Sequence, residues 1–198
     1  LVKVFNMDSE NEEEYTSLLK VVELNKCIRE SQASYLTRTL ICHLNKLHDC
    51  GQNHGRLRLD NVYIKTTGEN RGSMLVGTEK DNSASIRRNR CCCVSEQSKN
   101  SSCSPSSDVW SIGCLLIQML SGRVCCTGAS QDCLGLLYDS DRKSPLMPLG
   151  VSFACIDFLL DCLCSNPCER PSLSALFSHE FLSCGDASCQ LDLCVELD

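Results

Sequence analysis

The sequence predicts a mainly α-helical domain with a few short β-strands, which is an α+β fold. Three observations support this prediction. The chain has 198 residues, of which 42% are hydrophobic, and this is enough to bury one sizeable core. Apolar residues repeat at helical spacing in several segments, most clearly in the second half of the chain. Short apolar segments bounded by polar or turn residues, typical of strands, occur in the first half.

The N-terminal part is expected to form a hairpin and then a helix. Leu1–Phe5 alternates like a strand, Leu18–Leu24 is a second strand candidate, and an acidic loop lies between them. A helix is expected to begin at Ser31, which would act as its cap, and to end at Gly51. Its apolar stripe should face a core and consists of Ala33, Leu36, Leu40, Leu44 and Leu47.

Two short strands and a long loop are expected next. Asn61–Ile64 and Met74–Val76 are short and apolar, and a turn around Gly68 separates them. The segment from Lys80 to Ser107 is polar, rich in Ser and without an apolar period, which predicts a long loop.

The second half of the chain is expected to be helical. The best-formed helix is Asp108–Leu120, with Ser107 as its cap and Gly122 at its end. Apolar residues cover almost every face of this helix, which is typical of a buried central helix. Two more helices are expected, one with Phe153, Ile156, Leu159, Leu160 and Leu163, and one after Pro171 with Leu173, Leu176 and Phe177. The predicted domain spans residues 1–183, and residues 184–198 are an acidic tail.

The net charge of −6 argues against nucleic acids and membranes as partners, because both repel an acidic protein that lacks a large basic patch. Arg87, Arg88 and Arg90 form only a small patch. No apolar run approaches the roughly 18 residues that span a bilayer, and no signal-peptide pattern is visible. We therefore expect a cytoplasmic protein. Because Leu1 stands where an initiator Met would, the chain is expected to be a segment of a longer one.

The 18 cysteines would suggest a disulfide scaffold in a secreted chain, but their placement argues otherwise. Several fall inside periodic helical segments, where Cys serves as a small apolar residue, namely Cys42, Cys114, Cys155 and Cys162. Reduced structural thiols are therefore expected, with disulfides or a redox or metal sensor at Cys91–Cys93 as alternatives. We do not expect a zinc site at Cys162, Cys164, Cys168 and His179, because paired C-x-x-C spacing is absent.

Four stretches, in order and at suitable distances, resemble protein kinases. The stretch from Leu47 to Asn61 resembles the end of the kinase helix E and the catalytic loop, whose pattern is H-R-D-x-x-x-x-N. Ser107–Gly113 resembles the start of helix F. Phe158–Pro171 resembles the C-L-x-x-[DN]-P-x-x-R-P stretch, and Leu176–Leu182 resembles the closing L-L-x-H-x-F-[IL].

This resemblance runs from about the first residue to Leu182. It implies a protein kinase-like fold, consisting of the C-terminal lobe and a remnant or fragment of the N-terminal lobe. The chain starts at what resembles the fourth strand of that lobe, so either the rest lies outside the segment or the protein lacks it. The sequence is similar to those of serine/threonine kinases of the MAP-kinase-kinase-kinase type. A weaker resemblance, through Leu1–Met7 and Phe158–Arg170, is to the degenerate kinase-like domain of the starvation-responsive kinase of translation initiation factor 2.

The resemblance implies that the catalytic loop is degenerate. The catalytic Asp should stand two residues after His54, but this position is Arg56, which cannot accept a proton. The catalytic-loop Lys is replaced by Arg58, whose planar fork differs in geometry. Asn61 stands at the offset of a metal-binding Asn, although its amide could instead satisfy loop backbone groups.

The magnesium-binding D-F-G motif is also degenerate. The corresponding residues are Gly77, Thr78 and Glu79, so no carboxylate stands at the Asp position. The side chain of Glu79 or Asp81 could supply the missing magnesium ligand, but acidic side chains in loops are usually solvated. We therefore expect no metal and no cofactor, and keep ATP and magnesium binding through Asn61 as the alternative.

Residues with structural roles in kinases are better retained, namely Asp108, Trp110, Gly113 and Arg170. The resemblance implies that Asp108 accepts hydrogen bonds from the catalytic-loop backbone; otherwise it is an acid favoured by the helix dipole. Arg170 matches the Arg that pairs with the Glu of A-P-E. The corresponding stretch here is Ser104–Ser106, so Arg170 is expected to find another acceptor or solvent.

These residues predict that the protein is a pseudokinase. It would act as a regulatory or scaffolding module that binds a protein partner, such as a true kinase domain in the same or another polypeptide. The alternatives are a divergent, ATP-binding serine/threonine kinase with atypical metal ligands and the cysteine-based sensor. The Ser-rich segment from Ser83 to Ser107 could be controlled by phosphorylation, although a plain solvated loop is the simpler interpretation.

Overall fold

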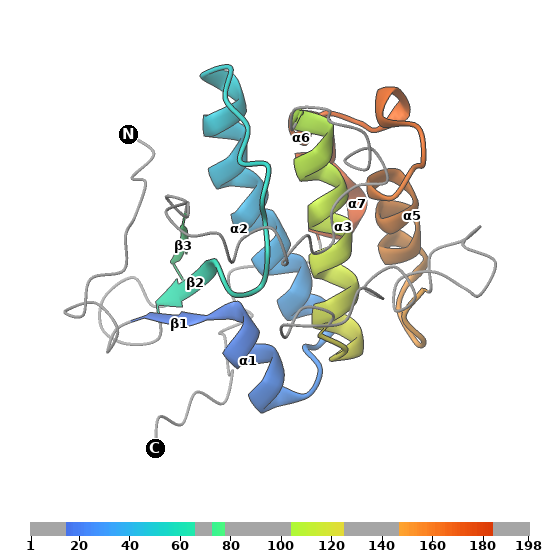
Figure 1. The fold of residues 1–198 in the computed structure, drawn as a ribbon. Helices are drawn as coiled ribbons and strands as arrows, with labels where there is room; N and C mark the ends of the chain where they lie inside the picture. The colour runs from blue at the N-terminus through green and yellow to red at the C-terminus, as the bar shows by residue number, and fades with distance from the viewer. Residues whose placement is uncertain (1–14, 66–72, 78–103, 125–146, 184–198) are drawn as a thin grey trace.

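The computed structural model describes residues 15–65, 73–77, 104–124 and 147–183. In this part of the chain a mostly helical body carries one small sheet (Figure 1). This arrangement confirms the predicted α+β class. The elements are β1 (Tyr15–Ser17), α1 (Leu18–Asn25), α2 (Glu30–Asp49), β2 (Val62–Lys65), β3 (Met74–Val76), α3 (Pro105–Ser121), α5 (Phe153–Cys162), the 3-10 helix η3 (Pro167–Glu169), α6 (Leu173–Phe177) and α7 (Glu180–Ser183).

The sheet has the order β1-β2-β3, and both pairs of strands are antiparallel. Thr16 lies opposite Ile64, and Tyr63 lies opposite Leu75. The two strands expected around Asn61–Ile64 and Met74–Val76 are thus confirmed as β2 and β3. The expected strand Leu1–Phe5 lies outside the described residues.

The second strand candidate, Leu18–Leu24, is wrong, because this segment forms helix α1. The Ser17 side chain caps the helix by accepting a hydrogen bond from the Lys20 backbone N–H, with a donor–acceptor distance of 3.3 Å. Leu18, Val21 and Val22 then bury one helix face. A short apolar run fits both helical and strand periods, and here the cap and the buried face favour the helix.

Helix α2 is confirmed, although it begins at Glu30 and Arg29 occupies its N-cap position instead of Ser31. No side chain caps this helix. The Glu30 carboxylate instead accepts hydrogen bonds from the backbone N–H and the hydroxyl of Ser152, at 2.8 and 2.5 Å. This contact joins the start of α2 to the start of α5. Gly51, with φ of 70°, lies just past the end of the helix as expected.

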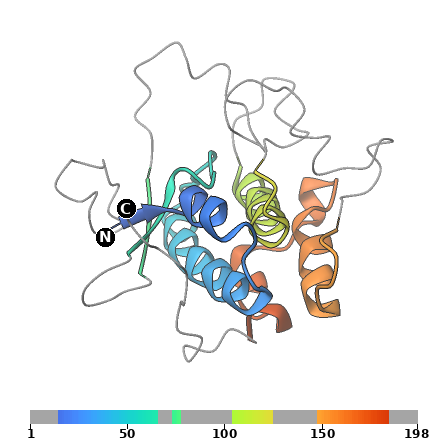
Figure 2. The ribbon, with the colours of Figure 1, turned by 90° about the horizontal axis from the view of Figure 1, so that it is seen from below.

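Helix α3 is the central helix that its all-round apolar pattern predicts. Residues from Ser107 to Met119 are buried, and the helix lies between α2 and α5 in both views (Figures 1 and 2). Its N-cap is Ser104 and not Ser107, which is the third residue of the helix and completes a capping box with Ser104. Gly122 ends the helix in a left-handed conformation, as expected.

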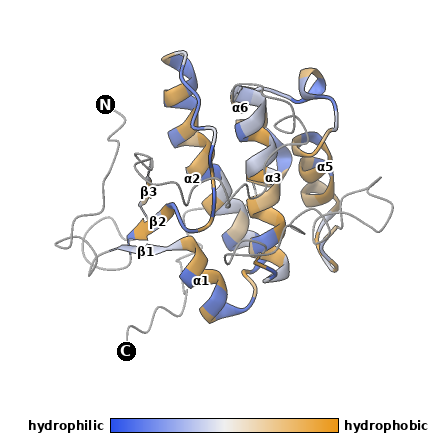
Figure 3. Cartoon of the chain, in the orientation of Figure 1, coloured by the Kyte–Doolittle hydropathy of each residue, from blue (hydrophilic) through white to orange (hydrophobic). Residues whose placement is uncertain are grey.

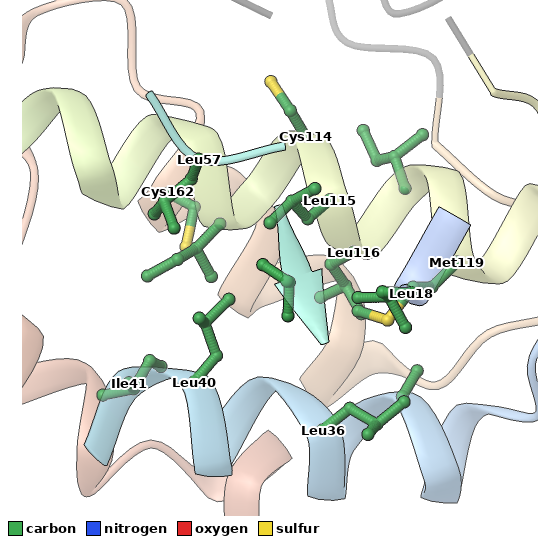
Figure 4. Close-up of a cluster of buried hydrophobic side chains, with 14 of the residues drawn as sticks. Leu18, Leu36, Leu40, Ile41, Leu57, Cys114, Leu115, Leu116, Met119 and Cys162 are labelled. Atoms are coloured by element: carbon green, nitrogen blue, oxygen red, sulfur yellow. The ribbon is translucent and has the colours of Figure 1, made fainter. Parts of the chain in front are cut away.

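A central part of the hydrophobic core lies between α2 and α3. Figure 4 shows Leu115, Leu116 and Met119 of α3 near Leu36 and Leu40 of α2. These side chains are at most 2% exposed. Figure 3 shows that α3 is hydrophobic over much of its length, whereas α2 carries hydrophobic and hydrophilic residues, as a helix with one buried side should.

The expected stripe of α5 is partly wrong. Phe153 and Leu160 are 91% and 51% exposed, whereas Cys155 and Cys162 are fully buried. The buried residues Cys155, Phe158, Leu159 and Cys162 follow one helical face, and Phe153 and Leu160 lie off it. Two cysteines therefore take the core positions. Helix α6 follows Pro171 as expected, and its Leu173 and Leu176 are buried.

None of the helices in the described ranges is long and apolar enough to cross a membrane.

Candidate functional site

The candidate site is the loop between α2 and β2, together with the end of β3 and the start of α3. The chain alternates along this loop: Leu57 and Leu59 are buried, Arg56 is exposed, and Arg58 and Asp60 are half-buried. The two leucines anchor the loop in the core. The polar residues that alternate with them, Arg56, Arg58 and Asp60, are thereby kept on the outer side of the loop.

Asp108 holds the first half of this loop. Its side chain is 0% exposed, and its carboxylate accepts three hydrogen bonds. The backbone N–H groups of His54 and Gly55 donate at 2.8 and 2.7 Å, and the His48 ring donates from Nε2 at 2.8 Å. The carboxylate therefore satisfies two loop N–H groups and a histidine that the sequence analysis did not single out. The two side chains are 60 positions apart, and the only sequence signal was the position of His48 in the Leu47–Asn61 stretch.

His54 connects the loop to the end of β3. Its Nδ1 accepts a hydrogen bond from the Arg56 backbone N–H at 3.2 Å, so Nε2 carries the hydrogen that is donated to the Gly77 carbonyl at 3.1 Å. Gly77 in turn donates its backbone N–H to the carbonyl of Asn61 at 2.8 Å. Both the N–H and the carbonyl of Gly77 are thus hydrogen-bonded to the loop. Thr78, Glu79 and Asp81 lie outside the described residues.

Asn61 holds the second half of the loop. Its Oδ1 accepts a hydrogen bond from the Arg58 backbone N–H at 2.9 Å, and its Nδ2 donates to the Arg56 carbonyl at 2.7 Å. The side chain is buried. Both ends of the amide are therefore used by backbone groups of the loop, which is the structural role considered for this residue from sequence.

Arg58 and Asp60 form a bidentate ion pair within the loop. Arg58 Nε donates to Asp60 Oδ1 at 2.8 Å, and Arg58 Nη2 donates to Asp60 Oδ2. The side chains are 15% and 34% exposed. Asp60 was not singled out from the sequence, where the only signal was its place two residues after an arginine; in the structure it lies in a turn. The guanidinium group of Arg58 thus has a carboxylate partner within its own loop.

Arg170 connects η3 to the start of α3. Its Nε donates to the carbonyl of Cys164 at 2.8 Å, its Nη1 donates to the carbonyl of Ser106 at 3.0 Å, and its guanidinium lies 4.7 Å from the centre of the Trp110 ring. Two backbone carbonyls and an aromatic ring thus surround the guanidinium group. Gly113, one turn further along α3, packs against Cys162 and Leu163.

The cysteines in the described ranges do not form a metal site. Cys162 is buried, Cys168 is exposed, and the Cys164 thiol donates to Glu169 at 3.5 Å. His179 instead lies 3.4 Å from Asp157. Among the described residues no three His, Cys, Asp or Glu side chains gather as metal ligands would. Burial, reinforced by the nearby Glu30 carboxylate, raises the pKa of the Cys155 thiol to about 12, so it stays a thiol. Cys91–Cys93 lie outside the described residues.

Comparisons with known proteins agree with the motif order. The family model for the protein kinase domain matches residues 4–182. A mitogen-activated protein kinase kinase kinase, mkh1 of Cytospora mali, is 27% identical over 179 residues, covering 80% of this chain and 10% of that protein. The mitogen-activated protein kinase kinase kinase 1 of Arabidopsis thaliana is 27% identical over 173 residues, covering 84% of this chain and 28% of that protein.

A shorter match is to the serine/threonine-protein kinase ATG1c of Arabidopsis thaliana, which is 39% identical over 80 residues, covering 38% of this chain and 11% of that protein. The chain thus spans less than a third of the length of each of these relatives. The helical body and the small sheet correspond to the C-terminal lobe of a kinase with a fragment of the N-terminal lobe. The chain belongs to the protein kinase domain family.

Proposed function

We propose that this domain is catalytically impaired and works as a regulatory or scaffolding module that binds a protein partner, such as a kinase domain in the same or another polypeptide. One observation carries the proposal. Phosphoryl transfer needs a carboxylate to orient the substrate hydroxyl and a second one to hold magnesium, and Arg56 and Gly77 stand at these two positions.

The contacts of the loop add support. Arg56 cannot accept a proton and would place a positive charge where a base is needed. Gly77 contributes only backbone groups, and these are bound to His54 and Asn61. The Asn61 amide is bound to the loop backbone at both ends. These groups form a poor donor set for magnesium, which favours carboxylates and water, so no step of the proposed function involves the metal.

The retained contacts support the binding role. The Asp108 carboxylate, the Arg170 guanidinium and the buried face of α3 hold the kinase scaffold together without a catalytic base. A rigid scaffold can still present a surface to a partner. The names of the relatives are consistent with a domain from a kinase signalling context, and the MAP-kinase-kinase-kinase type is the subfamily that we propose.

A phosphotransferase assay tests the impairment. The chain is incubated with ATP, magnesium and a mixture of serine- and threonine-containing peptides, and we expect no transfer above the background without protein. Arg56→Asp is the matched variant, and we expect it to stay inactive because the ligand at Gly77 is still missing. Magnesium-dependent turnover that disappears in Glu79→Gln would instead establish the alternative, a divergent serine/threonine kinase.

A separate experiment tests the regulatory role. An active kinase domain from the same polypeptide or organism is assayed with and without this chain, and we expect its rate to change at saturating chain concentration. Asp108→Asn, which we expect to be destabilised because it loses an acceptor of the loop N–H groups, serves as the control and should have a smaller effect. An unchanged rate for every kinase domain of the full polypeptide would contradict regulation in cis.

Two finer proposals remain. The likeness to the degenerate domain of the starvation-responsive kinase of translation initiation factor 2 predicts an intact kinase domain in the full polypeptide, and the complete coding sequence tests it. A cytoplasmic location is also proposed, and fluorescence microscopy of the tagged full polypeptide would check it.

A further inference from the structure

Helix α5 carries a stripe of large apolar side chains on its outer face. Phe153 and Leu160 are 91% and 51% exposed, and Ile156 between them is half-buried. The three residues are spaced by three and four positions, so they lie in one row along the helix. The opposite face of α5 is buried and packs against α3 and α7. Figure 2 shows α5 on the outer side of α3, away from α2.

This stripe is a local concentration of exposed apolar surface. Four large hydrophobic side chains are exposed in the part of the chain that the structure describes, and three of them lie between residues 149 and 160, namely Leu149, Phe153 and Leu160. The fourth, Leu24, stands alone on α1. A single exposed leucine is ordinary, whereas apolar side chains grouped at helical spacing on a surface are typical of a contact with another molecule.

An acidic edge runs beside the stripe. Asp157 and Asp161 are four positions apart and both are exposed. With about 100° of rotation per residue, they lie side by side between the apolar stripe and the flank of the helix. Asp157 is 75% exposed although His179 lies 3.4 Å away, so its carboxylate is open to a partner. The outer face of α5 is therefore apolar along one side and acidic along the other.

The surroundings of α5 strengthen the negative charge. Residues 147–183 contain a single lysine or arginine, Arg170, whose guanidinium is buried against the carbonyls of Cys164 and Ser106. The acidic residues of the same segment are all exposed, namely Asp157, Asp161, Glu169 and Glu180. This side of the domain therefore attracts a positively charged surface.

We propose that the apolar stripe and acidic edge of α5 are a docking surface for a basic, amphipathic helix of a partner protein. The apolar side of that helix packs on Phe153, Ile156 and Leu160, and its lysines or arginines lie beside Asp157 and Asp161. This inference rests on the proposed function, because it gives the partner-binding role a surface and the partner a chemistry.

Charge disfavours two other occupants of the surface. A second copy of α5 would bring its own acidic edge to this one, and like charges oppose such a contact. Residues 184–198 contain no lysine or arginine, and their acidic residues are Asp186, Asp192, Glu196 and Asp198. That segment would likewise be repelled by Asp157 and Asp161. A basic partner is the occupant that complements the whole face.

The first test measures binding of a fluorescein-labelled peptide of about 18 residues, with leucine and lysine in a helical pattern, by fluorescence anisotropy. We expect Phe153→Ser/Leu160→Ser to bind it at least about tenfold more weakly than the unchanged chain, because two large apolar contacts are lost. Leu24→Ser is the matched control and should change affinity by less than about twofold. Equal affinity of the unchanged chain and the double variant, or an equal loss in Leu24→Ser, would overturn the proposal.

The second test concerns charge. Asp157→Asn/Asp161→Asn should bind the leucine–lysine peptide about fivefold more weakly, because two exposed ion pairs are lost. Asp49→Asn, at the exposed end of α2, is the matched control and should stay within about twofold. A leucine–glutamate peptide of the same pattern should bind at least about tenfold more weakly than the lysine peptide. If the glutamate peptide bound equally well, the partner would not be basic and the proposal would be refuted.

Circular dichroism establishes that each variant is folded. Phe153→Ser alone replaces the double variant if the latter is unfolded, because Phe153 is almost fully exposed and contributes little to the core. We expect this single change to weaken binding of the lysine peptide at least about threefold. Unchanged affinity in a folded Phe153→Ser variant would also count against the surface.

Two measurements address the other occupants. Sedimentation of the chain should show a monomer, and self-association that Phe153→Ser abolishes would assign the stripe to a second copy instead. Leu193→Ser/Leu197→Ser, in the acidic C-terminal segment, should leave peptide affinity within about twofold. A gain of about tenfold in that variant would mean that the segment itself occupies the stripe, which contradicts the proposal.

The kinase-rate experiment separates this inference from the proposed function. The effect of the chain on a partner kinase should be lost in Phe153→Ser/Leu160→Ser and kept in Leu24→Ser. If the double variant changed the kinase rate as much as the unchanged chain, the regulatory role would stand and this surface would not be its docking site. If the peptide bound at the stripe while no kinase rate changed, the surface would stand and the regulatory role would be contradicted.

Discussion

Asp108 illustrates how one buried carboxylate organises the candidate site. Its two oxygens accept hydrogen bonds from the backbone of His54 and Gly55 and from the ring of His48. Without this carboxylate, the buried Gly55 N–H and the half-buried His54 N–H and His48 ring would lose this acceptor, which is costly. The carboxylate is thus required by the loop geometry whether or not the domain catalyses a reaction.

The first prediction is that Asp108→Asn destabilises the domain by about 2–4 kcal/mol. An amide offers one oxygen, and its NH2 group would face N–H donors of the loop. Urea unfolding followed by tryptophan fluorescence measures the effect, because Trp110 lies two residues away in α3. Asp49→Asn, at the exposed end of α2, is the control and should change stability by less than about 0.5 kcal/mol.

The second prediction concerns the buried Cys155 thiol, whose pKa is raised from 9.0 to about 12. Above pH 9 the unfolded chain releases this proton while the folded chain keeps it. The free energy of unfolding should therefore fall as pH rises from 9 toward 12, by up to about 1.4 kcal/mol per pH unit from this group. Urea unfolding at several pH values between 8 and 11 measures the slope.

The Cys155→Ala variant provides the control for this pH dependence. It should be less stable at pH 7 because it leaves a small cavity in the core, but its stability should fall less steeply above pH 9. Parallel slopes for the two proteins would show that the thiol does not titrate differently in the folded state.

At the scale of elements, the C-terminal end of α3 depends on a close approach of the backbone of another segment. Gly122 has φ of 66°, and a Cβ atom there would lie 1.4 Å from the Lys26 carbonyl oxygen. The N–H of Ile28 donates to the carbonyl of Met119 at 2.7 Å next to this contact. The turn between α1 and α2 is therefore packed directly on the end of α3, and only glycine fits.

The third prediction compares Gly122→Ala with Gly51→Ala. Both glycines have positive φ, but a Cβ at Gly51 would meet nothing within 4 Å. Gly51→Ala should cost about 1–2 kcal/mol from backbone strain alone. Gly122→Ala should lose at least about 2 kcal/mol more, or fail to fold, because Lys26 must also move. Thermal unfolding of the two variants measures both losses of stability. Equal losses would mean that the Lys26 backbone moves away from residue 122 at little cost.

At the scale of the whole molecule, α3 connects the two sides of the domain. Helix α2 and the α1–α2 turn pack on one side of it, and α5 and η3 pack on the other (Figure 2). Arg170 closes the second side, because its guanidinium binds the carbonyls of Ser106 and Cys164 and stacks near Trp110. Two backbone segments and a ring are thus held by one planar group.

The fourth prediction is that Arg170→Lys costs about 1–3 kcal/mol, although the charge is kept. An ammonium group cannot reach both carbonyls from one position and stacks less well on an aromatic ring. Urea unfolding measures the loss, and Arg123→Lys is the matched control because Arg123 is exposed. If Arg170→Lys made the η3 region more sensitive to proteolysis but left the free energy of unfolding unchanged, Arg170 would stabilise only that region.

Much of the fold follows from sequence because local signals agreed with packing. The pattern of α3 was apolar on all sides, so its burial was required by any soluble fold. Helix α2 had a stripe of leucines and a glycine at its end, and the order of the kinase motifs specified the relative positions of the loop and α3. The sequence also shows Arg56 and Gly77 at the positions on which the proposed loss of catalysis depends, because that proposal uses only residue identity and spacing.

Only the tertiary structure decided the rest. Residues 18–24 form a helix because Ser17 caps it and Leu18, Val21 and Val22 have a core to enter, which the short run alone does not specify. Phe153 is exposed because Cys155 and Cys162 fill the core face of α5. His48 meets Asp108, and Asp60 meets Arg58, through contacts set by the folded backbone. Composition and periodicity determine which segments are buried, whereas pairing between particular polar groups depends on where the chain brings them together.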